Sequence, residues 1–143
     1  MITNEFRMSV DSRSVNESFS RAVVSAFAAQ LDPTVEEIND IKTAVSEAVT
    51  NAIVHGYNNM LGKIYISVKI RDNRLVVISI KDKGVGIDDI KKAREPLFTT
   101  LGGDRAGLGF SVMESFMDHI TVRSKVGKGT TVTLYKRING RRI

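Results

Sequence analysis

The chain has 143 residues, of which 42% are hydrophobic and 26% are charged, a composition typical of one globular domain. It contains no cysteine, which excludes a disulfide framework and a thiolate metal site. The sequence opens without a signal peptide, and its apolar runs are too short to cross a bilayer. We therefore expect a cytoplasmic protein that makes no membrane contact.

The net charge of +5 could suggest a nucleic-acid partner, but its distribution along the chain argues against one. Lys136, Arg137, Arg141 and Arg142 supply +4 of it, which leaves +1 for all other residues. We interpret 136–143 as a solvated basic tail on a single domain that spans 1–143. No basic helix with interleaved aromatic residues is present, so we expect no direct contact with nucleic acid.

The first half of the chain predicts one strand followed by two helices. Apolar residues alternate with polar ones from Phe6 to Val10, which indicates a strand. Apolar residues then recur at helical spacing over 16–31, and Asp32 and Pro33 end that helix. Thr34 is a candidate N-cap for a second helix that ends near Gly56.

The second half predicts two hairpins that flank a glycine-rich region. The expected elements are strands over 64–70 and 75–80, a short helix after the DKGVGIDD loop, a helix over 110–117, and strands over 120–122 and 130–134. The order β-α-α-β-β-α-loop-α-β-β predicts an α+β, two-layer α/β sandwich with a mixed or antiparallel sheet. The chain has no βαβ alternation and no GxxxxGK[ST] motif, which excludes Rossmann and P-loop folds.

Three polar residues lie four apart on the second helix. Glu47, Asn51 and His55 share one helix face and run toward the edge of the apolar stripe. Such a row could line a cleft beside the sheet. On spacing alone, a solvated helix flank is the favoured explanation.

The segment DKGVG follows a predicted buried strand directly. Asp82 ends that strand, and Gly84 and Gly86 let the backbone approach a flat ligand closely. A carboxylate there can accept a hydrogen bond from an exocyclic amine such as N6 of adenine. A simple turn is the alternative, because DxG alone is common.

Two further glycine motifs could contribute to the same site. Gly107 and Gly109 lead into a helix, where free backbone amides can hold an anion such as phosphate. Thr130 follows Gly129 at the start of the last strand, where its hydroxyl could support Asp82 or a water beside it. Each motif alone could also be a flexible turn.

Taken together and in this order, the motifs resemble the Bergerat (GHKL) ATP-binding fold of DNA gyrase B, Hsp90 chaperones, histidine kinases and MutL. Several longer segments narrow the match: NESFSR at 16–21, QLDPT at 30–34, SEAVTNAIVHGYNN at 46–59, PLFTT at 96–100 and MESFMD at 113–118. These closely resemble the sporulation anti-sigma-F factors, the SpoIIAB family of serine protein kinases. The resemblance covers nearly the whole chain.

The resemblance implies a role for each motif residue. Glu47 would be the general base that takes the proton from a substrate serine, Asn51 would ligate Mg²⁺, and Asp82 would bind adenine. His55 is expected to be a structural hydrogen bonder. The other expected ATP-binding residues are Gly84 and Gly86 beside the base, Thr99, Thr100 and Arg105 in a lid over the phosphates, Gly107 and Gly109 as amide donors, and Thr130 near Asp82.

The lid departs from the family pattern. It usually reads PLFTTKPELERSGMGF, whereas here it reads PLFTTLGGDRAGLGF and is one residue shorter. Leu101, Gly102, Gly103 and Asp104 stand where a lysine and a proline-acidic segment are usual, so we assign no phosphate-binding lysine in this lid.

The partners follow from the resemblance alone. The family's dimer holds sporulation sigma factor F inactive when ATP is bound, and it phosphorylates the anti-anti-sigma factor SpoIIAA on a serine. Arg21 is a candidate for contacting a partner protein, and a solvated helix arginine is the alternative. Homodimerisation through the first strand is likewise implied.

Three other interpretations remain open. A related stress-response anti-sigma serine kinase would share every motif. A nucleotide-binding module could sequester a sigma factor with little phosphate transfer, although Glu47 argues against this. A histidine-kinase catalytic domain or another ATPase of the fold is disfavoured, because no phosphoacceptor helix is found before the ATP motifs.

Overall fold

The computed structural model describes residues 1–95 and 109–140, which build one antiparallel sheet covered by helices on one face. Its strands are β1 (Ile2–Asp11), β2 (Lys63–Arg71), β3 (Leu75–Asp82), β4 (His119–Lys125) and β5 (Gly129–Arg137), in the spatial order β1-β2-β3-β5-β4. Every neighbouring pair is antiparallel. The predicted α+β sandwich and element order are confirmed, and the sheet is antiparallel throughout the described chain.

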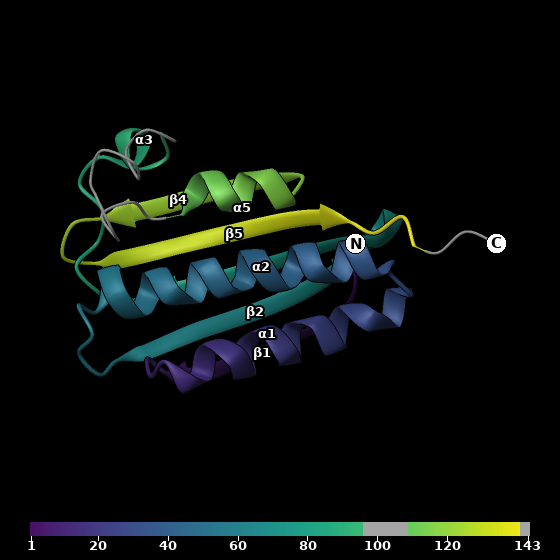
Figure 1. The fold of residues 1–143 in the computed structure, drawn as a ribbon, viewed down its shortest axis with the longest axis horizontal. Coiled ribbons are helices and arrows are strands. Elements are labelled where there is room, and N and C mark those ends of the chain that lie inside the picture. Colours follow the sequence, from purple (N-terminus) through teal and green to yellow (C-terminus); the bar gives the residue numbers. More distant parts are fainter. Residues whose placement is uncertain (96–108, 141–143) are drawn as a thin grey trace.

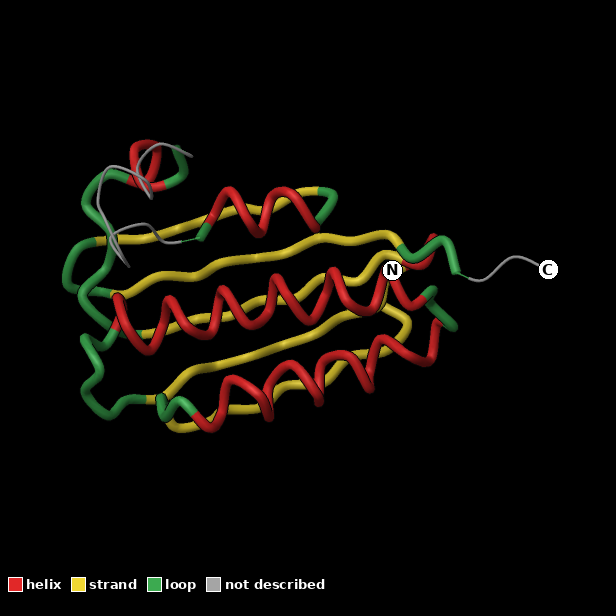
Figure 2. The backbone as a smooth tube through the Cα atoms, viewed as in Figure 1, coloured by secondary structure: helices red, strands yellow, loops and turns green. Residues whose placement is uncertain are grey.

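The helices lie on one side of this sheet (Figure 1). They are α1 (Val15–Ala28), α2 (Val35–Asn51) and α5 (Phe110–Phe116), and the short α3 (Ile90–Ala93) lies near one end of the sheet. Figure 2 shows α2 running along the middle of the layer, with α1 and α5 on either side. Within the described ranges, no helix is long and apolar enough to cross a bilayer.

The core lies between α2 and the inward-facing residues of the strands. Val68, Ile78 and Leu134 point inward from three adjacent strands, and each is fully buried. Ile41 and Val45 meet them from α2 and are equally buried. Each such side chain stabilises the fold by about 1.5–3 kcal/mol relative to exposure, so the packing of α2 on the central strands fixes the position of the helix.

The two ends of α2 differ in how they are held. At its start, the Thr34 hydroxyl accepts a hydrogen bond from the Glu37 amide, and the Glu37 carboxylate accepts one from the Thr34 amide. This capping box confirms Thr34 as the N-cap. At its end, the helix does not continue as an α-helix to Gly56 as predicted, because Ala52–Gly56 forms a single π-helical turn. Such turns are rare and are frequent at functional sites.

The prediction that residues 136–143 form a solvated basic tail is wrong for the part that the structure describes. Lys136 and Arg137 belong to β5, Lys136 is buried, and Ile138 is fully buried. The amides of Asn139 and Gly140 then donate hydrogen bonds to the Glu37 carboxylate at 2.7 and 3.1 Å. The prediction failed because this segment continues the alternation of the last strand, which the basic side chains obscured. Residues 141–143 lie outside the described chain.

Much of the positive charge lies on the sheet face that the helices leave open. Lys63, Arg71, Lys81 and Arg123 are exposed and alternate along their strands with inward-facing residues, and the exposed Lys83 directly follows β3. In an antiparallel strand, alternate residues point to opposite faces. The open face of the sheet therefore carries positive charge that does not come from residues 136–143.

One polar contact ties the two layers together. The Lys136 ammonium lies 3.2 Å from the Asp40 carboxylate of α2 and donates a hydrogen bond of 2.9 Å to the Phe116 carbonyl at the end of α5. Removing one partner of a largely buried ion pair leaves the other charge uncompensated, which costs more than the pair itself contributes.

Asp40→Ala is therefore expected to lower the free energy of unfolding by about 1–3 kcal/mol. Adding Lys136→Met should restore part of the loss, because the stranded charge is then removed. Urea unfolding measures both effects, with Asn39→Ala, an exposed change on the same helix, as the control. Equal stability of Asp40→Ala and the control would show that the ion pair is not needed.

Candidate functional site

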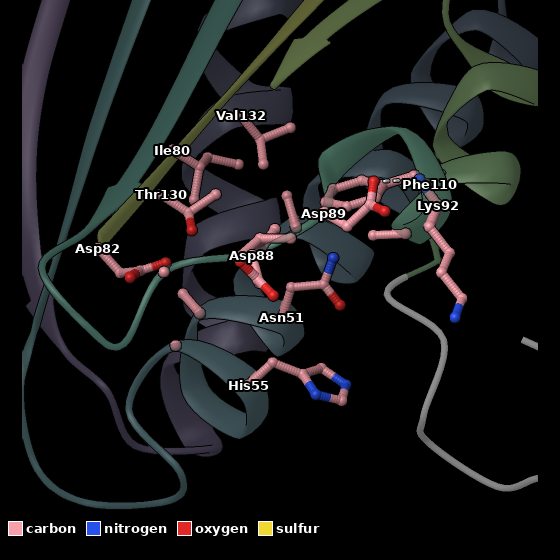
Figure 3. A pocket seen from close by; sticks show the side chains of 16 residues that line it. Asn51, His55, Ile80, Asp82, Asp88, Asp89, Lys92, Phe110, Thr130 and Val132 are labelled. Atoms are coloured by element: carbon pink, nitrogen blue, oxygen red, sulfur yellow. Dashed lines mark hydrogen bonds between the residues drawn. The ribbon is translucent and has the colours of Figure 1, made fainter. Parts of the chain in front are cut away.

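A pocket of about 500 Å³ opens between the end of α2, the ends of β3 and β5, and the helices α3 and α5. This volume lies within the range of small-molecule sites in proteins. Ala48, Ala52, Ile80, Val132 and Phe110 supply much of its apolar lining. The polar side chains that line it include Asn51, His55, Asp82, Asp88, Asp89, Lys92 and Thr130 (Figure 3). An apolar slot with a few convergent polar groups is suited to a flat, partly polar ligand.

Asp82 is a buried carboxylate at the inner end of this pocket, with 5% of its surface exposed. Burial raises the pKa of its carboxyl group above the usual value, while hydrogen bonds from the Gly84 and Thr130 amides act in the opposite direction. The Gly84 amide lies 2.9 Å from Oδ1. Because two backbone donors hold it, the side chain is fixed in one orientation and can accept a further hydrogen bond from a ligand.

Two glycines allow the end of α2 to approach Asp82. A Cβ on Gly56 would lie 2.8 Å from the Asp82 carboxylate oxygens, and a Cβ on Gly84 would lie 1.9 Å from the Gly56 carbonyl oxygen. The Val85 amide donates to that same carbonyl at 2.9 Å. The loop after β3 is thus seated directly on the π-helical turn, and no larger residue fits at either glycine.

The two glycines of the DxGxG motif have different positions. Gly86 lines the pocket and has φ +79°, and a Cβ there would lie 2.3 Å from the Lys125 carbonyl oxygen. Gly84 packs against the helix end and is not among the lining residues. The close approach expected at Gly84 is therefore to the protein's own backbone.

The row of Glu47, Asn51 and His55 is divided between the pocket and its rim. Asn51 is 7% exposed and lines the pocket, as does His55 one turn later. Glu47 is half-buried and is not part of the lining. Its carboxylate instead lies against Gly109 at the start of α5, where a Cβ would come within 2.4 Å of Oε2. Asn51 and Asp82 therefore share one cavity, with Glu47 one turn beyond Asn51.

Thr130 supports Asp82 through its backbone, whereas its side chain has another role. Its amide donates to Asp82, while its hydroxyl lies 2.8 Å from the Ser124 hydroxyl. Ser124 also accepts a hydrogen bond of 2.7 Å from the Ile87 amide. The hydroxyl pair thus joins the β4–β5 hairpin to the loop after Gly86, rather than contacting Asp82 as expected.

Arg21 lies on α1, outside the pocket. Its guanidinium pairs with Glu17 one turn earlier on the same helix and lies 3.3 Å from the Ser46 hydroxyl. Ser46 precedes Glu47 in the chain, so Arg21 also lies close to Glu47 in space. Thr99, Thr100, Arg105 and Gly107 fall outside the described residues.

Sequence reasoning missed several residues of this site. The sequence predicts Gly56 only as a helix end, and Ser124 gives no signal because a lone serine in a strand is common. The sequence places Asp88, Asp89 and Lys92 only in a loop and a short helix, yet they line the pocket. The acidic residues soon after DxGxG are a usable signal for pocket residues, because they lie next to a motif that is expected to bind a ligand.

The described residues contain no group of three or more His, Cys, Asp or Glu arranged to hold a metal ion. A divalent ion in this pocket would have to take most of its ligands from a bound molecule and from water. Mg²⁺ behaves in this way with phosphates, keeping several waters and few protein ligands. The Asn51 amide oxygen is of the type that Mg²⁺ accepts, so the donor set fits a magnesium–phosphate ligand.

Comparison with known proteins agrees with the motifs. Residues 9–136 match the histidine kinase-like ATPase domain family. Anti-sigma F factors from Thermoanaerobacter sp. (strain X514), Geobacillus thermodenitrificans and Bacillus velezensis are 58%, 56% and 51% identical to this chain. These alignments cover 95%, 94% and 95% of this chain, and 95%, 93% and 94% of the relatives.

Solved structures show the same fold at low sequence identity. The RsbU and RsbW domains of a Mycobacterium tuberculosis protein align with a TM-score of 0.68 at 22% identity, over 95% of this chain and 32% of that one. The histidine kinase domain of Erythrobacter litoralis EL346 aligns with a TM-score of 0.59 at 15% identity, over 87% and 60%. The chain therefore belongs to the histidine kinase-like ATPase domain family and, within it, to the family of the anti-sigma F factors.

Proposed function

We propose that this protein is an ATP-dependent serine protein kinase that also binds and inhibits the sporulation sigma factor F. Its phosphorylation substrate would be the anti-anti-sigma factor SpoIIAA. The observation that carries this proposal is the pocket that joins Asn51 and Asp82, with Glu47 beside its outer end. The family assignment supports it, because the relatives that cover nearly the whole chain are named anti-sigma F factors.

ATP would lie with its adenine at Asp82 and its phosphates toward Asn51. The buried carboxylate suits the exocyclic amine of adenine, and the apolar residues Ile80 and Val132 suit its flat faces. Asn51 would hold Mg²⁺, which neutralises charge on the phosphates when it is bound. Positioning and charge neutralisation supply most of the catalysis in phosphoryl transfer, so these residues need little further chemistry.

Glu47 would act as the general base for the substrate serine. Its carboxylate lies at the start of α5, beyond Asn51 and away from Asp82, where an incoming hydroxyl could reach it. From there it would accept the serine proton as the hydroxyl attacks the terminal phosphate. A module that only binds nucleotide would not need a base at this position.

Glu47→Gln should keep ATP affinity within about twofold, since the side chain does not line the pocket, but should lower phosphate transfer by roughly 10²–10⁴-fold. The assay is incubation with labelled ATP, Mg²⁺ and SpoIIAA, in which acid-stable label on a serine is the expected product. Glu36→Gln, an exposed change on the same helix, is the matched control. Undiminished transfer by Glu47→Gln would remove Glu47 from this role.

Other outcomes of the same assay identify the competing functions. Sigma-factor binding without any transfer would favour a sequestering module, and acid-labile label would favour a histidine kinase. Transfer to a stress-response anti-anti-sigma protein in preference to SpoIIAA would favour the related stress-response kinase.

Adenine binding at Asp82 should depend on pH in a defined direction. Burial raises the pKa of this carboxyl group, so it becomes protonated at a higher pH than an exposed aspartate. The protonated form loses its acceptor strength toward an amine, so adenosine affinity should fall as the pH is lowered from 7. Titration calorimetry with adenosine, which has no titrating phosphate, measures this.

Asp82→Asn is expected to weaken adenosine binding at least about tenfold at pH 7 and to abolish the pH dependence. The free energy of unfolding should change little, because the substitution also removes the cost of burying a charge. A pH dependence that persists in Asp82→Asn would assign the titration to another group.

The protein is further proposed to form a homodimer through β1. This strand is at the edge of the sheet, and a long unpaired edge readily pairs with another chain. If two copies pair antiparallel about Phe6, Glu5 of one copy lies opposite Arg7 of the other, and both point to the open face. The edge is thus complementary to itself in charge.

Arg7→Glu should therefore weaken the dimer by placing like charges opposite each other, and Glu5→Arg in the same chain should restore it. Analytical ultracentrifugation measures the dissociation constant, with Arg13→Glu, which lies beyond the strand, as the control. A dimer that tolerates Arg7→Glu unchanged would exclude this pairing.

Arg21 is proposed to contact a partner protein. Its side chain is 40% exposed although it is held by Glu17, and it lies next to Ser46 and hence near the proposed base. A substrate protein that presents its serine to Glu47 would therefore pass close to Arg21.

A further inference from the structure

We propose that Lys92 on α3 binds the outer phosphates of the nucleotide in this site. This inference rests on the proposed function, because it assumes that the ligand of the pocket is ATP. It adds a residue that the motifs do not contain and gives it the role of the phosphate-binding lysine that the lid sequence lacks.

The carboxylates of the pocket favour a protein cation near the phosphates, in addition to the Mg²⁺ proposed at Asn51. Its described lining includes three carboxylates, those of Asp82, Asp88 and Asp89, and the only permanent positive charge among the described lining residues is that of Lys92. A nucleoside triphosphate carries several negative charges. Without a cation, these acidic groups would repel the phosphates. Lys92 is therefore the described residue best suited to offset that repulsion.

The position of Lys92 matches the phosphate end of the ligand. In Figure 3, Asp82 and Lys92 lie on opposite sides of the pocket, with Asn51 between them in this view. A nucleotide with its adenine at Asp82 and its metal held by Asn51 would place its outer phosphates within reach of Lys92. The lysine side chain extends from α3 away from Asp82, as such a contact requires.

The backbone that carries Lys92 is anchored at both ends of α3. The Asp89 carboxylate caps the helix by accepting a hydrogen bond of 3.0 Å from the Lys92 amide. Two residues after Lys92, the Arg94 guanidinium donates two hydrogen bonds, of 2.9 and 2.7 Å, to one carboxylate oxygen of Glu114 on α5. The lysine is thus presented from a fixed turn, which reduces the entropy lost when it binds an anion.

The neighbouring Lys91 provides a matched comparison. It lies on the same turn, is also exposed and carries the same charge, but it is not among the lining residues. Any effect of overall charge should therefore be the same for the two lysines. An effect of a direct phosphate contact should appear at Lys92 alone.

The test compares a non-hydrolysable ATP analogue with adenosine, in the presence of Mg²⁺, for wild type, Lys92→Ala, Lys92→Arg and Lys91→Ala. Calorimetry follows the analogue, and NMR titration follows the weaker adenosine. Lys92→Ala should lose roughly tenfold or more in affinity for the analogue, the loss expected for one charge-assisted hydrogen bond. Its affinity for adenosine should be unchanged, and Lys92→Arg should retain most of the affinity for the analogue.

Two results would overturn the inference while leaving the proposed function standing. In one, Lys92→Ala binds the analogue as tightly as wild type or no worse than Lys91→Ala. In the other, it loses affinity for adenosine to the same extent, which would make Lys92 a structural residue. If wild-type protein binds neither ligand, the proposed function fails, and this inference fails with it.

Discussion

The arrangement of the site depends on how the Asp82 carboxylate is buried. It lies where the π-helical end of α2, the end of β3 and the start of β5 meet, and two backbone amides hold it. Gly56 and Gly84 make this possible, because a Cβ on Gly56 would clash with the Asp82 carboxylate and a Cβ on Gly84 would clash with the Gly56 carbonyl. A charge buried in this way costs free energy unless it is well paired. Such a cost is typical of groups that are retained for binding. The Asp82 carboxylate therefore marks one fixed end of the pocket.

The other end is assembled from elements that are far apart in the sequence. Asn51 comes from the last turn of α2, Gly109 and Phe110 from the start of α5, and Lys92 from α3. The core between α2 and the central strands positions the first of these, and the Arg94–Glu114 contact joins the other two helices. The two ends therefore differ in kind: backbone contacts enclose the end proposed for the nucleoside, and side chains on separate helices line the end proposed for the phosphates.

Most of the fold could be predicted because its periodicities are clear. The alternation in β2 and the capping box at Thr34 both appear in the structure as expected. The end of α2 could not be predicted, since nothing in the composition of Ala52–Gly56 distinguishes a π turn from an α turn. The burial of Ile138 is not evident from the sequence, because basic neighbours obscure its strand pattern. The convergence of Asn51 and Asp82 was expected from family resemblance, and spacing alone would have left Glu47 and Asn51 on a solvated flank.

The central claim is that one cavity holds adenine at Asp82 and the phosphates near Asn51. A crystal structure of the protein with Mg²⁺ and a non-hydrolysable ATP analogue tests it most directly. The account predicts that N6 of adenine lies within hydrogen-bonding distance of the Asp82 carboxylate, with the metal on the Asn51 amide oxygen. A nucleotide bound elsewhere on the molecule, or bound here with its phosphates at Asp82, would contradict the account.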